Sequence, residues 1–80
     1  MILWTLHYSQ DVIRYLYQLR EKGSLVRGAV QSLKSEPVLE GSEASKSIPN
    51  RFVLIIDEYF VVYELDHANH RIHVLSVGVE

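Results

Sequence analysis

The stretch that decides the fold is Asp57-Glu58-Tyr59-Phe60-Val61-Val62-Tyr63-Glu64-Leu65-Asp66. Its polar start, Asp57-Glu58, separates the apolar run from an earlier one at residues 51–56, and a turn-like Asp66-His67-Ala68-Asn69 follows it. Short polar connections between β-prone runs are typical of antiparallel neighbours. The pattern predicts three consecutive strands at residues 51–56, 59–65 and 70–79, arranged as a β meander.

The N-terminal part combines one strand with two helices. Residues 2–8 alternate in character, as a strand does, and Ser9 can cap a helix that follows. Lys22-Gly23 is expected to end this helix, and Ser24 to begin a second one that stops at Ser35-Glu36-Pro37. The order β-α-α-β-β-β predicts one α+β domain over residues 1–80, with a helical hairpin packed on a small, mainly antiparallel sheet.

The two predicted helices leave one apolar face of the predicted sheet uncovered. Residues 52–56 and 60–63 are apolar at every position, so both faces of these strands are apolar, and two helices can cover only one of them. An uncovered apolar face usually marks an interaction site. A partner or a second copy of the chain is expected to contact Phe52, Leu54, Phe60 and Val62. Alternatively, the long segment 38–50 folds over this face, aided by Leu39 and Ile48.

Composition excludes several classes of protein. Eight Lys and Arg residues against ten Asp and Glu residues argue against strong non-specific nucleic-acid binding, which needs clustered cations. The absence of cysteine removes disulfides and thiolate chemistry. No signal peptide and no apolar run of membrane-spanning length is recognisable, so we expect a soluble, cytoplasmic protein with no membrane contact and no cofactor.

Four segments resemble the RelE/ParE superfamily of toxins from type II toxin–antitoxin systems. They are the strand-to-helix start at residues 4–9, the helix ending Ser35-Glu36-Pro37, the stretch Asp57 to Asp66, and the last strand Ile72-His73-Val74-Leu75-Ser76-Val77-Gly78. The resemblance implies a toxin of a bacterial plasmid-stabilisation type, neutralised by a cognate antitoxin. It implies action through messenger-RNA cleavage on the ribosome, or through poisoning of DNA gyrase.

The chain departs from that family at the positions that bind phosphate. The arginine of the family's Tyr-Arg-Val motif falls on Phe60, and the basic residue after the final glycine falls at about Glu80. Neither side chain can stabilise an anionic transition state. The alternative is therefore a degenerate protein-interaction or dimerisation module without nuclease activity, and whether the chain is an enzyme stays open.

Three residues are the candidates for any remaining ribonuclease activity. Arg71 and His73 share one face of the last strand, and Arg51 begins a strand that can lie nearby. The two guanidinium groups could bind a phosphate while His73 acts as general base. The competing interpretation is purely structural, with Arg71 at a solvated edge. His67, His70 and His73 recur every three residues but need not converge, so we expect solvated turn histidines and no metal site.

Overall fold

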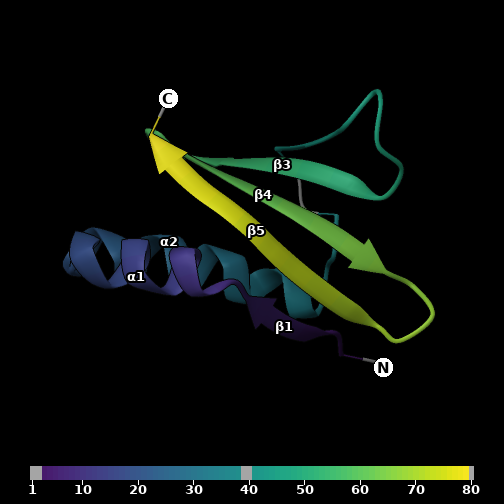
Figure 1. Cartoon of the computed structure of the whole chain (residues 1–80), viewed down its shortest axis with the longest axis horizontal. Coiled ribbons are helices and arrows are strands. Elements are labelled where there is room, and N and C mark those ends of the chain that lie inside the picture. The colour runs from purple at the N-terminus through teal and green to yellow at the C-terminus, as the bar shows by residue number, and fades with distance from the viewer. Residues whose placement is uncertain (1–2, 39–40, 80) are drawn as a thin grey trace.

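The computed structural model describes residues 3–38 and 41–79 of the chain. Two helices lie on one side of a twisted sheet, as Figure 1 shows. The elements follow in this order: β1 (Thr5–Tyr8), α1 (Gln10–Leu19), α2 (Glu21–Gln31), a short 3₁₀ helix η1 (Ser32–Lys34), β2 (Ser42–Ala44), β3 (Arg51–Ile56), β4 (Tyr59–Asp66) and β5 (Arg71–Val79). This is the predicted α+β order, with a short additional strand, β2, between η1 and β3.

The helical hairpin turns earlier than its sequence suggested. Ser9 caps α1 as expected, because its Oγ accepts a hydrogen bond from the Val12 amide at 3.3 Å. The predicted ending at Lys22-Gly23 is wrong, since α1 stops at Leu19 and Arg20 makes the turn with a φ of 57°. Gly23 lies inside α2, where a Cβ would overlap the Leu16 carbonyl oxygen. This glycine is needed for close approach of the two helices rather than for a helix end.

The sheet has the strand order β1-β5-β4-β3-β2. β1 pairs in parallel with β5, and the other three pairings are antiparallel. The meander β3–β4–β5 is therefore confirmed. The first strand joins the far side of β5, which places residues from the two ends of the described chain next to each other.

The segment expected as a long loop contributes a strand at the sheet edge. β2 pairs with residues 52–54 of β3, so it forms an edge strand of the sheet and does not lie over its face. Ile48 remains 37% exposed. The alternative in which this segment covers the uncovered face is wrong for residues 41–50, and Leu39 lies outside the described residues. The pairing has a simple cause, because it satisfies backbone groups along the edge of β3.

The core fills the space between the helices and one face of the sheet, here called the inner face. Strand β4 alternates strictly between buried and half-buried residues, and its inner side chains are Tyr59, Val61, Tyr63 and Leu65. Val12, Leu16, Val26, Val30 and Leu33 cover them from the helical side, and Leu54, Ile72 and Val74 from neighbouring strands. The Tyr63 hydroxyl donates to the Pro37 carbonyl at 2.8 Å, which ties the segment after η1 to this core.

Within residues 3–38 and 41–79, no helix combines the length and apolarity that crossing a bilayer requires.

Candidate functional site: the outer face of the sheet

The face of the sheet turned away from the helices, here called the outer face, divides into two chemically distinct ends. Residues paired across neighbouring strands point to the same side of a sheet. Val53 pairs with Val62 and Ile55 with Phe60 at one end. We call these four residues the apolar outer patch. At the other end the register aligns polar side chains instead, from Arg51 on β3 to His7 on β1.

Two of the four residues predicted to contact a partner lie on the outer face, and the other two point into the core. Phe60 and Val62 lie on the outer face as expected, but Leu54 is only 4% exposed and belongs to the core. Phe52 also points inward, where its ring stacks on Tyr63 with centroids 5.6 Å apart. Grouping Phe52 and Leu54 with Phe60 and Val62 was wrong because strand alternation places the two pairs on opposite faces. Their outer counterparts on β3 are Val53 and Ile55.

Part of the Phe60 side chain packs against the neighbouring strand of the sheet. It pairs with Gly78 of β5, and a Cβ at Gly78 would come within 2.6 Å of the Phe60 ring. The ring therefore covers the glycine that ends the family-like motif of the last strand. Ile55, by contrast, remains 41% exposed. Within the apolar outer patch, Phe60 is thus half-buried next to Gly78 and Ile55 is exposed.

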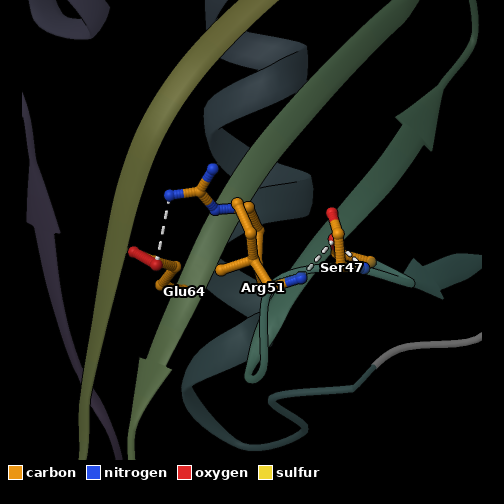
Figure 2. A network of polar contacts seen from close by, with 5 residues as sticks. Ser47, Arg51 and Glu64 are labelled. Carbon is orange, nitrogen blue, oxygen red and sulfur yellow. Dashed lines mark hydrogen bonds and ion pairs between the residues drawn. The ribbon is translucent and has the colours of Figure 1, made fainter.

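We call the opposite end of this face the polar outer patch; it contains His7, Arg51, Glu64, Asp66, Arg71 and His73. Arg51 is paired there rather than available, because its Nη2 lies 3.2 Å from Oε1 of Glu64, and Figure 2 shows the guanidinium pointing toward that carboxylate. The two side chains are each 32% exposed. Nε of Arg51 is buried and has no hydrogen-bond partner in the described structure. The carboxylate of Glu64 thus balances the charge of Arg51, which makes Arg51 a weaker ligand for phosphate.

Arg71 and His73 lie on the same outer face as Arg51. They belong to β5, whereas Arg51 belongs to β3, and β4 lies between these two strands. Glu64 pairs with Arg51 on one side and with His73 on the other, so the strand β4 separates the predicted arginine from the predicted base. Arg71 lies opposite Asp66 in the register of β4 and β5, and it is exposed. The pKa of Asp66 is lowered, chiefly by a hydrogen bond from the Asn69 side chain and least by the charge of His73. The structure brings two of the three candidates together and leaves Arg51 in an ion pair.

His7 is the polar residue that the sequence interpretation missed. It pairs with His73 across the parallel β1–β5 contact, and the two rings stack with centroids 5.5 Å apart and planes 29° apart. The alternation of residues 2–8 already placed His7 on one side of a strand. Nothing in that alternation could show that this strand pairs with β5.

The remaining histidines are engaged elsewhere. His67 and His70 approach the ring of Trp4 edge-on, with centroids 5.4 Å and 5.2 Å away. His73 therefore has a different neighbour from the other two members of the predicted series. Among residues 3–38 and 41–79, no three His, Cys, Asp or Glu side chains are close enough together to hold a metal ion.

The helical side also exposes apolar side chains, which makes it the rival surface for a partner. Ile13 and Tyr17 of α1 and Leu25 of α2 are exposed, Tyr17 by 82%. A groove between the two helices, near the turn that connects them, is lined by Leu16, Tyr17, Arg20, Glu21, Gly23, Ser24 and Arg27. Its lining contains more charge than the apolar outer patch does.

No protein-family model matches the chain, and no curated protein matches it. Solved structures do match, over almost its whole length. The isolated RelE toxin of Escherichia coli aligns with a TM-score of 0.81 and 15% identity, covering 95% of this chain and 83% of that one. The archaeal RelE–RelB complex from Pyrococcus horikoshii aligns with a TM-score of 0.81 and 14% identity, covering 98% and 96%.

A third match is the toxin–antitoxin complex RelBE2 from Mycobacterium tuberculosis, with a TM-score of 0.75 and 20% identity, covering 99% of this chain and 100% of that one. The described helices, the meander and the parallel first strand all fall within these alignments, since each covers nearly the entire chain. The chain therefore has the fold of the RelE-like toxins.

Proposed function

We propose that this chain is the toxin-family component of a bacterial type II toxin–antitoxin pair, and that a cognate antitoxin binds and neutralises it in the cytoplasm. The observation that carries the proposal is the RelE-like fold, which extends over 95% to 99% of the chain in the three alignments. Two of those matched structures are complexes of a toxin with its antitoxin. A fold can host several functions, so the surface must supply the rest of the support.

The apolar outer patch supports the antitoxin part of the proposal. Val53, Ile55, Phe60 and Val62 form four neighbouring positions in register, and the described segment 41–50 does not cover them. A protein partner that covered this patch would remove apolar surface from water, which contributes roughly 25 cal/mol per Å². An antitoxin segment that carries its own apolar side chains would suit this surface.

The polar outer patch supports an effect on RNA. His73 is proposed as general base and Arg71 as phosphate ligand, with Arg51 acting only if its ion pair to Glu64 opens. Such a site would inhibit translation by cleaving messenger RNA. Arg71 is exposed and next to His73 on one face, as a phosphate ligand must be.

A second candidate function is a degenerate interaction module that binds a partner but cleaves nothing. Two observations favour it. Phe60 occupies the position at which the resemblance leads one to expect arginine, and its ring is packed over Gly78. Arg51 is held by Glu64. Both features remove positive charge from the surface that an RNA backbone would approach.

Growth measurements separate the candidates. The chain is induced alone in a bacterium, and again together with the product of the small reading frame adjacent to its gene. We expect growth arrest in the first culture and recovery in the second, with the two proteins copurifying. Copurification without arrest would select the interaction module. A chain that is detectable in the cells yet causes no arrest and binds no such product would contradict the proposal.

A further inference from the structure

The imidazole rings of His7 and His73 stack on each other, and His7 has no role in the proposed function. The rings belong to neighbouring strands, face each other with centroids 5.5 Å apart, and lie on the outer face. His7 is exposed and His73 half-buried, so a ligand on that face can reach both. Arg71 belongs to the same strand as His73, two residues before it, and pairs with Thr5, two residues before His7.

Two imidazoles and one guanidinium on the same face of a sheet can supply the acid, the base and the phosphate ligand for cleaving a phosphodiester next to a hydroxyl. Near neutral pH one imidazole can accept a proton while another donates one. A guanidinium can bind the non-bridging oxygens of the phosphate with two hydrogen bonds and offset the charge of the transition state. His67 and His70 lack this arrangement, because the rings of both lie edge-on to the ring of Trp4.

We propose that His7 is the general acid of an RNA-cleaving site in which His73 is the general base and Arg71 the phosphate ligand. This inference rests on the proposed function and replaces Arg51 as a member of the site. RNA is the substrate class because the two roles need a hydroxyl that attacks and an oxygen that leaves, both attached through one phosphate.

The reaction balances without any further reactant. His73 takes the proton of the 2′-hydroxyl, and O2′ forms a bond to phosphorus. The bond from phosphorus to O5′ breaks, and O5′ takes a proton from the imidazolium of His7. The products are a 2′,3′-cyclic phosphate and a 5′-hydroxyl, and the protein has moved one proton from His7 to His73.

The sharpest test changes the leaving group. The full-length chain is assayed on messenger RNA, free and ribosome-bound, and on the same RNA with sulfur in place of the bridging O5′. His7→Gln should slow cleavage of ordinary RNA about 100-fold or more, because a general acid typically contributes that much. The sulfur substrate should be slowed by less than about threefold, since a thiolate leaves without a proton. His73→Gln should slow both substrates.

The pH dependence supplies a second readout. The rate of the wild type should fall at both acid and alkaline pH, and His7→Gln should lose the alkaline fall. His67→Gln serves as the matched control and should leave both limbs in place. Equal slowing of the two substrates by His7→Gln, or loss of the acid limb instead, would overturn the role given to His7.

A binding measurement completes the test without catalysis. A DNA oligonucleotide of the same sequence lacks the 2′-hydroxyl and cannot be cleaved by this route. Its addition should shift the ring proton resonances of His7 and His73 but not those of His67. A wild type that cleaves neither substrate overturns this inference, whereas growth arrest relieved by the antitoxin would still support the proposed function. Absence of both arrest and partner binding would remove the proposed function as well.

Discussion

The two ends of the outer face differ in chemistry although the same strands build both. Along β4 the outer side chains change from Phe60 and Val62 to Glu64 and Asp66, while the inner ones stay apolar throughout. The inner face must be apolar because helices cover it, whereas the outer face is free to vary. The change along the outer face is therefore where function can be sought, and we propose docking at the apolar end and RNA chemistry at the polar end.

The largest expected effect tests which face a residue belongs to. Leu54→Ala should lower the free energy of unfolding by about 2–5 kcal/mol, because it leaves a cavity in the core. Its neighbour Ile55 is 41% exposed, so Ile55→Ala should cost less than about 1 kcal/mol. Urea denaturation of the two variants measures both values. Equal losses would mean that the two faces are not distinct.

The next effect concerns the apolar end. Ile55→Glu places a charge at the margin of the apolar outer patch and should weaken antitoxin binding about 30-fold or more, the scale of an interface hot spot. Leu25→Glu is the matched control, since Leu25 is 53% exposed on α2, on the helical side of the sheet. Calorimetric titration gives the two dissociation constants. If both substitutions weaken binding alike, the patch has no special role.

A smaller effect is expected at the polar end, for the pair Arg51 and Glu64. A double-mutant cycle with Arg51→Met and Glu64→Gln should give a coupling of about 0.5 kcal/mol, because each side chain is a third exposed and solvent screens the pair. Thermal unfolding of the four proteins supplies the coupling. A coupling near zero would mean that Glu64 does not hold Arg51, and Arg51 would again be a candidate phosphate ligand.

The smallest effect is a pH dependence at Asp66. Its pKa lies below the usual 3.8, first because the Asn69 side chain donates to the carboxylate at 2.9 Å. A lowered pKa in the folded state stabilises the protein above the unfolded value, and the stabilisation disappears as pH falls through the folded value. The stability difference between the wild type and Asp66→Asn should therefore shrink below pH 3.8. A difference that stays constant there would contradict the lowered pKa.

Local patterns in the sequence predicted the two helices and four of the five strands, but not the strand β2, the position of the turn between the helices or the pairing of the strands. The turn residues around Asp57 and Asp66 predicted the meander, and Ser9 predicted the start of α1. The hairpin turn at Arg20 was missed because a non-glycine residue there adopts a positive φ, which glycine was expected to provide.

The candidate site was half predictable for the same reason. Alternation placed Arg71 and His73 on one face, and the structure confirms that arrangement. The contact of His7 with His73, and the position of Glu64 between His73 and Arg51, depend on strand order and register. Those are set by long-range pairing, which a single strand's pattern does not contain.

The most direct test is a methyl NMR titration of the chain with the antitoxin proposed to bind it. If the partner covers the apolar outer patch, the methyl groups of Val53, Ile55 and Val62 should shift and show contacts to the added protein. Leu54 and Val61, on the inner face, should stay in place. Shifts confined to Ile13 and Leu25 on the helical hairpin, with the outer methyl groups unmoved, would show that the antitoxin binds the rival surface instead.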